Sequence, residues 1–569
     1  MKIINKVAIS ALLFNLMSTV NVFAAELDKP NILFIAIDDL KPLIGEYGIA
    51  DARTPNIDDF ANQSVVFQRA YSQFPVCGPS RMNLLTGLRP ETNGILNLSD
   101  TIREVNPDVI TLPQQLIANG YITAAAGKIF DPRNVGDNYD SQSWSINYVK
   151  VSTDVDKKTA VNLAVKSIDE EDESKFVDGK IAAQGMQLMA NLAEQDKPFF
   201  LAVGFKKPHL PFFAPKAYFD LYQQDDFQLA AFQQIPQFSD ESFISHHSAE
   251  LVKNYNASAG QSYEETITPT QQAELIHGYY ASTSFIDAQF GKLLQQLDEL
   301  NLTDNTIVVI WGDHGFHLGD HGFWGKHTVL EQATQIPLII KVPGVPALNT
   351  YALIESTDLY PTILELSGAE VGAHLQGVSQ VKVLAQQASS VRSAAISQFR
   401  RNGAMGYSLR TQNYRYNEWW KTNGSGLAYR ELYDLSNDPQ ETENIFDNDS
   451  DTLLQQQLYN LLRENGQGLN LLQGELQDVE PLIEEVYVEE PPVEEEPPTE
   501  EEPPIEEDPP IEEEPPVEEE SPVEEESPVE EESPVADETP GSSSGGSVFW
   551  LTLLTTFVYS AKKYRNLNG

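Results

Sequence analysis

The stretch Asn31-Ile-Leu-Phe-Ile-Ala-Ile-Asp38-Asp39 carries the strongest evidence for the fold of this 569-residue chain. Its apolar run is short and uninterrupted, as in strands that are buried on both faces of a parallel sheet. Two adjacent carboxylates follow where the run ends. Similar runs alternate with polar loops and helical patterns further along, which predicts an α/β fold with a central mixed, mostly parallel sheet flanked by helices.

Four later runs repeat this pattern, at Tyr121–Ala126, Phe199–Phe205, Thr306–Trp311 and Pro337–Val342. The first three lead into charged or ligating residues, which are Gly127-Lys128, Lys206-Lys207-Pro208-His209 and Gly312-Asp313-His314-Gly315. Open α/β sheets place their sites along the carboxyl edge of the strands. We therefore expect these residues to meet at one edge of the sheet.

The strand pattern weakens after about Gly368. Short strands at Ala394–Gln398 and Met405–Arg410, with a late helix at Thr452–Glu464, predict a smaller C-terminal α+β lobe. We place the catalytic α/β domain at residues 25–367 and this C-terminal subdomain at residues 368–475.

Composition excludes several classes of protein. The chain has 85 acidic and 37 basic residues, a net charge of −48, and 27 of the acidic residues lie between Pro481 and Pro540. The remainder still carries −21, which argues against nucleic-acid binding, since that needs clustered Lys and Arg. A single cysteine excludes an intramolecular disulfide framework and a cysteine-based zinc cage.

Both ends of the chain have the composition of processing or spacer segments. Residues 1–24 combine two early lysines, a mostly apolar stretch and the small-residue site Val22-Phe23-Ala24. This order predicts a signal peptide that signal peptidase removes. Residues 476–540 are rich in proline and mutually repelling glutamates, which predicts an extended, disordered stalk.

The last segment, residues 541–569, runs from Gly545-Gly546 through the apolar stretch Val548–Ala561 to a basic end. This order resembles the GlyGly-CTERM sorting tail of Gram-negative bacteria, which implies cleavage by a rhomboid-type protease and delivery to the cell surface. A plain C-terminal membrane anchor is the alternative. Either interpretation predicts an exported protein, surface-bound or secreted, with membrane contact only through residues 548–565.

Two acidic motifs at strand ends suggest a metal site. Asp38-Asp39 would repel each other unless a cation lay between them, and Asp313-His314 adds a carboxylate and an imidazole. This donor set suits Ca²⁺ or Mg²⁺ better than a thiolate-bound metal.

The only cysteine, Cys77, comes just before Pro79, a residue that suits the first turn of a helix. Its sulfur is therefore expected near a helix N-terminus, where anions are favoured, and Arg81 adds a fork of donors for an oxyanion. A thiolate nucleophile would need a nearby histidine base, and none is close in sequence. Spacing alone leaves the chemistry open.

The stretch Cys77-Gly-Pro-Ser-Arg81, followed by Leu85-Thr86-Gly87, resembles the signature of the formylglycine-dependent sulfatases. Asn31–Asp39, the Gly312–Gly315 turn and Asp358–Ile363 extend the match. Within the family, the segments Phe199–Phe212 and Met405–Arg410 are most similar to the iduronate-2-sulfatase branch. The resemblance implies an alkaline-phosphatase-like fold and removal of O-sulfate from sulfated oligo- or polysaccharides, with 2-O-sulfated uronates as the expected sugars.

The resemblance also implies residue roles. A formylglycine-generating enzyme oxidises Cys77, and the hydrated aldehyde attacks sulfur. One Ca²⁺, or alternatively Mg²⁺, is held by residue 77 together with four ligands: Asp38, Asp39, Asp313 and His314. The other catalytic residues are Arg81, which helps to activate the nucleophile, Lys128 and Lys326, which neutralise sulfate oxygens, and His209, which protonates the departing sugar oxygen.

One position departs from the family pattern. The family commonly has histidine where this chain has Asp131, in Gly127-Lys128-Ile-Phe-Asp131-Pro132-Arg133. Asp131 is a candidate base for sulfate release, with Arg133 offsetting its charge. Trp419-Trp420-Lys421 and Arg400-Arg401 are candidate sugar and anion contacts, although paired tryptophans also pack in cores. Two alternative functions remain, a phosphoric ester hydrolase of the same superfamily and a non-catalytic glycan-binding surface protein.

Overall fold

The computed structural model describes residues 29–49, 51–152, 162–244, 249–257, 261, 263, 266–447, 452–470 and 476–484. The signal peptide, nearly all of the acidic stalk and the C-terminal sorting segment lie outside the described residues, so these remain predictions. Within the described ranges, no helix combines the length and apolar character needed to cross a membrane.

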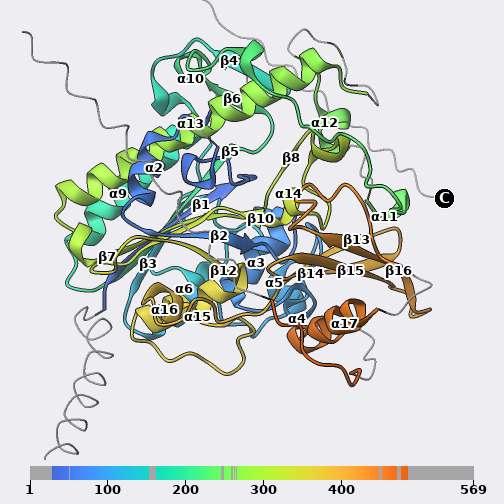
Figure 1. Ribbon diagram of the computed structural model, residues 1–569. Helices are drawn as coiled ribbons and strands as arrows, with labels where there is room; N and C mark the ends of the chain where they lie inside the picture. Colours follow the sequence, from blue (N-terminus) through green and yellow to red (C-terminus); the bar gives the residue numbers. More distant parts are fainter. Residues whose placement is uncertain are drawn as a thin grey trace, which may run out of the picture. The chain divides into compact units, whose positions relative to one another are not determined.

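A mixed eight-stranded sheet forms the centre of the described chain (Figure 1). Its order is β10-β2-β11-β7-β1-β5-β3, with β12 paired to β2. Most neighbours are parallel, and only β10 and β11 run against their neighbours. The strands are β1 (Asn31–Asp38), β2 (Val65–Tyr71), β3 (Ile122–Gly127), β5 (Phe199–Pro208), β7 (Thr306–Gly312), β10 (Gln335–Ile336), β11 (Leu338–Lys341) and β12 (Leu348–Glu355). The predicted α/β sheet is therefore confirmed.

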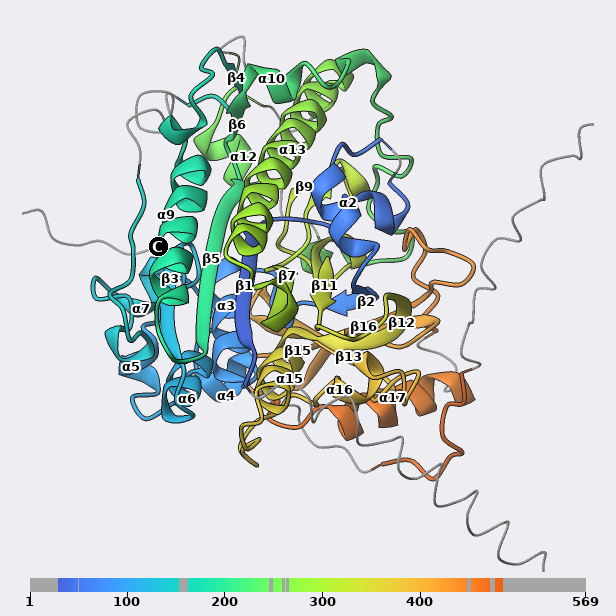
Figure 2. The ribbon, with the colours of Figure 1, turned by 90° about the vertical axis from the view of Figure 1, so that its left-hand side faces the viewer.

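Strand β1 lies inside the sheet and is buried on both faces, which explains its unbroken apolar sequence. Leu33, Ile35 and Ile37 pack in the core that contains α9 (Val177–Ala193) and α13 (Pro269–Glu299). The alternate residues pack on the opposite face, against α3 (Cys77–Thr86), α6 (Leu112–Ala118) and α15 (Leu359–Leu366). Figure 2 shows α9 and α13 in front of β5 and β1.

The smaller C-terminal lobe contains an antiparallel sheet in the order β13-β14-β15-β16 (Ala395–Arg401, Ala404–Arg410, Tyr414–Lys421 and Leu427–Asp434). Helix α17 (Leu453–Asn465) buries Leu458 and Leu462 in the core of this lobe. The lobe is joined to the central domain by backbone hydrogen bonds, such as the one from Gln398 N to Gln73 O at 2.8 Å. The predicted α+β lobe is confirmed.

Shorter elements complete the described chain: α2 (Pro55–Ala61), α4 (Pro90–Asn93), α5 (Ile102–Val105), α7 (Pro132–Val135), α10 (Lys216–Phe219), α11 (Glu241–Ile244), α12 (Ala249–Asn254), α14 (Glu331–Thr334), α16 (Val381–Leu384), β4 (Val165–Ile168), β6 (Phe212–Pro215), β8 (His317–Leu318) and β9 (Trp324–Gly325). Strand β4 pairs with β6, and β8 pairs with β9.

Candidate active site

Three buried carboxylates meet where β1 and β7 end. Asp38 is the last residue of β1, and Asp39 follows with a φ of 60°, in the left-handed region that non-glycine residues seldom adopt. Asp313 follows β7, and its Oδ1 accepts a hydrogen bond from Asp39 N at 2.9 Å. All three are at most 1% exposed. The parallel register of β1 and β7 therefore brings the two predicted acidic motifs into contact.

Two cationic side chains form ion pairs with this carboxylate cluster. Arg81, fully buried on α3, donates from Nε to Asp313 at 2.9 Å and from Nη2 to Asp38 at 3.0 Å. Lys128, the residue after β3, donates to the other oxygen of Asp38. Burial alone would raise the pKa of Asp38, but Lys128 and Arg81 lower it well below its ordinary value. Asp38 is thus held as a carboxylate.

Cys77 begins helix α3, as the position of Pro79 predicts. Its Sγ lies 3.3 Å from His314 Nε2, 3.5 Å from Lys326 Nζ and 3.7 Å from Asp39 Oδ1. Burial raises the pKa of the Cys77 thiol well above its ordinary value. An unmodified Cys77 is therefore a poor thiolate nucleophile, although it lies at the centre of the cluster.

Lys326 and His209 lie beside Cys77 and Asp39. Lys326 Nζ donates to both carboxylate oxygens of Asp39, at 2.7 and 2.8 Å. His209 follows β5, and its Nδ1 donates to Leu210 O at 2.7 Å. Its Nε2 therefore faces the cluster, 4.0 Å from Asp39 Oδ2. All nine site residues predicted from the sequence are brought together here.

The donor set fits a hard divalent cation. His314 donates from Nδ1 to Gly315 O at 3.0 Å, and its Nε2 lies 3.4 Å from Asp39 Oδ1 and 3.7 Å from Asp313 Oδ1. Burial lowers the pKa of His314, which favours the neutral ring with a lone pair on Nε2. That lone pair and two carboxylate oxygens would repel one another without a cation among them. Geometry also allows Asp38, Asp39, Cys77 and His209 to share an ion.

Asp131 is buried and paired. It accepts two hydrogen bonds from the Arg133 side chain, at 2.8 Å from Nε and 2.7 Å from Nη2, and it caps α7 through Arg133 N at 3.1 Å. Burial alone would raise the pKa of Asp131, but the bonds from Arg133 and the charge of Lys128 lower it. These contacts argue against the suggestion that Asp131 is a base, because its oxygens are already committed to Arg133.

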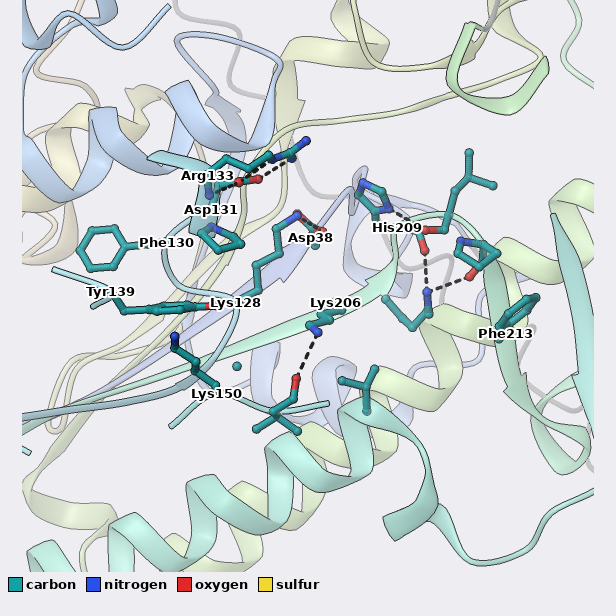
Figure 3. Close-up of a pocket in the computed structure, with 17 residues that line it drawn as sticks. Asp38, Lys128, Phe130, Asp131, Arg133, Tyr139, Lys150, Lys206, His209 and Phe213 are labelled. Atoms are coloured by element: carbon teal, nitrogen blue, oxygen red, sulfur yellow. Dashed lines mark hydrogen bonds and ion pairs between the residues drawn. The ribbon is translucent and has the colours of Figure 1, made fainter. Parts of the chain in front are cut away.

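A cavity of about 490 Å³ opens beside the cluster (Figure 3). Asp38, Lys128 and His209 line the part next to the cluster. Through this cavity, a ligand can reach the buried cations and carboxylates.

The contacts predicted in the C-terminal lobe do not line the cavity just described. Trp419 is 1% exposed and donates from Nε1 to Glu431 at 3.0 Å, so its prediction as a sugar contact is wrong. Trp420 donates to Glu418 at 2.8 Å, and Lys421 is exposed. Arg400 and Arg401 line a separate cavity of about 570 Å³ with Val76 and His327, which are chain neighbours of Cys77 and Lys326.

Two site residues were missed by sequence reasoning. Glu250, on α12, lies 3.6 Å from His209 Nε2 and 3.7 Å from Lys326 Nζ. Tyr279, on α13, donates its hydroxyl to Asp39 O at 2.6 Å. Neither follows an apolar strand run or belongs to a motif, so no local signal could have identified them.

The chain matches two family models, one described as sulfatase over residues 30–369 and one described as N-sulphoglucosamine sulphohydrolase, C-terminal, over residues 319–467. It is 31% identical over 510 residues to iduronate 2-sulfatase of Mus musculus, which covers 74% of this chain and 92% of that protein.

Two solved structures share the fold. One, a complex with its substrate D-glucosamine-2-N,6-O-disulfate, is 22% identical with a TM-score of 0.64 and covers 77% of this chain and 98% of that one. The phosphonate monoester hydrolase of Agrobacterium radiobacter is 21% identical with a TM-score of 0.64 and covers 78% of this chain and 96% of that one. At such identity the likeness concerns the fold, and it confirms the alkaline-phosphatase-like architecture.

Proposed function

This chain belongs to the sulfatase family, and we therefore propose that it hydrolyses O-sulfate esters of sulfated saccharides and releases inorganic sulfate. One observation carries the proposal. Cys77 lies within 3.7 Å of Asp39, His314 and Lys326, at the carboxyl edge of the sheet. Water supplies the oxygen that sulfate gains, and the sugar leaves as an alcohol.

Residue 77 and a metal supply the nucleophile in this proposal. Asp38, Asp39, Asp313 and His314 would hold Ca²⁺ or Mg²⁺, whose charge would lower the pKa of a hydroxyl on the hydrated formylglycine made from Cys77. Arg81 fixes Asp38 and Asp313 by the hydrogen bonds described above. Lys128 and Lys326 are fixed by Asp38 and Asp39, so their ammonium groups are positioned to stabilise sulfate oxygens.

His209 is the proposed proton donor to the departing sugar oxygen. Because Nδ1 is committed to Leu210 O, Nε2 is the atom that can transfer a proton. Lys207 Nζ donates to His209 O at 2.8 Å, which fixes the backbone that carries the ring. Glu250 Oε1 lies 3.6 Å from the same Nε2.

For the substrate we propose a 2-O-sulfated uronate, as in the iduronate-2-sulfatase branch. Support comes from the identity with mouse iduronate 2-sulfatase, which extends over 92% of that protein. The fold alone does not separate sulfate from phosphorus esters, because a phosphonate monoester hydrolase shares it. Discrimination between these esters therefore has to be measured.

The test is sulfate release by full-length protein coexpressed with a formylglycine-generating enzyme. 4-Nitrophenyl sulfate, a 2-O-sulfated uronide and 4-nitrophenyl phosphate are compared at equal concentration, with Cys77→Ala as the control. We expect both sulfate esters to be cleaved and the phosphate ester to react far more slowly. Faster cleavage of the phosphate ester would favour the phosphoric ester hydrolase, and no cleavage of any ester would favour the non-catalytic alternative.

A further inference from the structure

The cavity next to the candidate active site is strongly basic. Its lining includes five basic residues, Lys128, Arg133, Lys150, Lys206 and Lys207, and two acidic ones, Asp38 and Asp131. The chain outside residues 481–540 carries a net charge of −21. A basic cavity in such an acidic protein indicates an anionic ligand.

Lys128 belongs to the sulfate-binding cluster, but Lys150 and Lys206 do not. Lys150 Nζ donates to Asp137 O at 2.6 Å and lies 4.4 Å from the centre of the Tyr139 ring. Lys206 Nζ donates to Val151 O at 3.3 Å. Across the described residues, neither lysine forms an ion pair with a carboxylate. Their charges are therefore available to a ligand in the cavity.

Arg133 is fixed at the same cavity by Asp131. The two parallel hydrogen bonds use Nε and Nη2, so Nη1 makes no hydrogen bond to Asp131. The Arg133 side chain is 54% exposed, whereas Asp131 is 1% exposed. Figure 3 shows Arg133 lying against Asp131 on one side of Lys128, with Lys150 and Lys206 on the other.

We propose that Arg133, Lys150 and Lys206 form a second anion subsite, which binds a second acidic group of the saccharide whose sulfate lies at Lys128. This second acidic group is a carboxylate or a second sulfate, on the same sugar or on the next one. This inference rests on the proposed function for the position of the first sulfate. It deepens that function, because it names the residues that bind the second acidic group of the substrate.

Asp131, the residue that departs from the family pattern, pairs with Arg133 at this cavity. A carboxylate beside a basic cavity would repel an anionic ligand if it stood alone. Here it is neutralised by Arg133 and in return orients that guanidinium at the cavity. Asp131 is thus a positioning residue for Arg133.

Binding to full-length Cys77→Ala tests the subsite without turnover. Calorimetry compares three probes: a methyl 2-O-sulfo-uronopyranoside, its carboxyl methyl ester, and a methyl hexoside with two sulfates. We expect the free acid to bind at least roughly tenfold more tightly than the ester. Lys150→Gln and Lys206→Gln, added to Cys77→Ala, should each weaken binding of the free acid by about 5- to 10-fold. Each should weaken binding of the ester by less than about 2-fold.

Lys197→Gln is the matched control, since Lys197 is exposed and lies just before β5, whereas Lys206 lies near the end of that strand. This substitution should change neither the affinity for the free acid nor the affinity for the ester. If the disulfated hexoside behaves like the acid, the subsite accepts any second anion; if only the acid does, the subsite is selective for carboxylate. Equal binding of acid and ester to Cys77→Ala would overturn the proposal without any lysine variant.

Turnover of 4-nitrophenyl sulfate by mature protein separates the two proposals, because this probe has a single anionic group. Turnover together with equal binding of acid and ester would leave the sulfatase activity standing and remove the second subsite. Tighter binding of the acid without turnover would retain the subsite and remove the proposed hydrolysis. Lys197→Gln, which lies outside the cavity lining, should leave this turnover within about 2-fold of wild type.

Discussion

The Nζ atom of Lys326 spans the carboxylate of Asp39, at 2.7 Å from one oxygen and 2.8 Å from the other. The same nitrogen lies 3.5 Å from Cys77 Sγ, and both side chains are buried. Burial alone would lower the pKa of Lys326, but Asp39 and its other acidic neighbours raise it well above its ordinary value. A permanent positive charge is thus held beside the residue proposed to attack sulfur.

Replacing Lys326 by alanine should lower kcat for 4-nitrophenyl sulfate by about 10²- to 10³-fold, the usual loss when a preorganised charge is removed from a transition state. Lys341→Ala is the control, because Lys341 ends the nearby strand β11 and donates to Gln63 rather than to the cluster. Steady-state kinetics on both variants provide the measurement. A Lys326→Ala enzyme with more than half of the wild-type kcat would contradict the role.

Cys77→Ala should abolish sulfate release and leave the fold intact, because the change removes only one buried heavy atom, the Cys77 sulfur. We expect a loss of unfolding free energy of about 1 kcal/mol. In the unsubstituted protein, mass spectrometry of the tryptic peptide Ala70–Arg81 should find an aldehyde in place of the thiol. An unmodified thiol in fully active protein would rule out formylglycine chemistry.

Prolonged dialysis against a chelator should lower turnover, and added Ca²⁺ or Mg²⁺ should restore it. The metal should also raise the Tm of Cys77→Ala by several degrees, since an ion at 100 times its Kd stabilises a native protein by ~2.7 kcal/mol. This second readout does not depend on catalysis. Asp313→Asn should remove most of the metal-dependent shift. A Tm that changes with neither the chelator nor the metal would count against the metal site.

Sequence patterns predicted the residues that directly follow strands. Asp38, Lys128, His209 and Asp313 come at the ends of apolar runs, and parallel pairing carries such positions to one edge. Lys326 follows no long strand, since β9 has only two residues, so its role came from the family resemblance alone. Glu250 lies in a polar segment of the chain, and only tertiary packing brings it to His209.

The burial of the paired tryptophans could not be predicted from the sequence. Successive side chains of a strand point to opposite faces, so Trp419 and Trp420 in β15 could not both be exposed on one surface. Trp419 packs beside Gly406, where an added Cβ would lie 2.7 Å from the indole ring. The sequence shows the alternation, but which face is covered depends on the neighbouring strand and on Phe243.

Glu331 links the two lobes and gives a pH-dependent prediction. It accepts hydrogen bonds from Tyr71 at 2.8 Å and Arg410 at 3.1 Å, and it pairs with Arg415. Burial alone would raise the pKa of Glu331, but Arg410 and Arg415 lower it to about 2. The pKa is therefore lower in the folded than in the unfolded state. Its contribution to stability is complete above the unfolded pKa of about 4.3 and is lost as pH falls toward 2.

Glu331→Gln should consequently destabilise the protein by roughly 3 kcal/mol at pH 7, because it leaves buried Arg410 without a carboxylate and Arg415 with Glu441 alone. The difference in Tm from wild type should shrink steadily as the pH falls below about 4.3, where wild-type Glu331 also begins to lose its advantage. Calorimetric scans between pH 3 and 8 measure this difference in Tm. Glu365→Gln, an exposed change on α15, should match wild type throughout. A Glu331→Gln deficit that is the same at pH 3 and pH 7 would show that the side chain stabilises the lobe contact by shape rather than by charge.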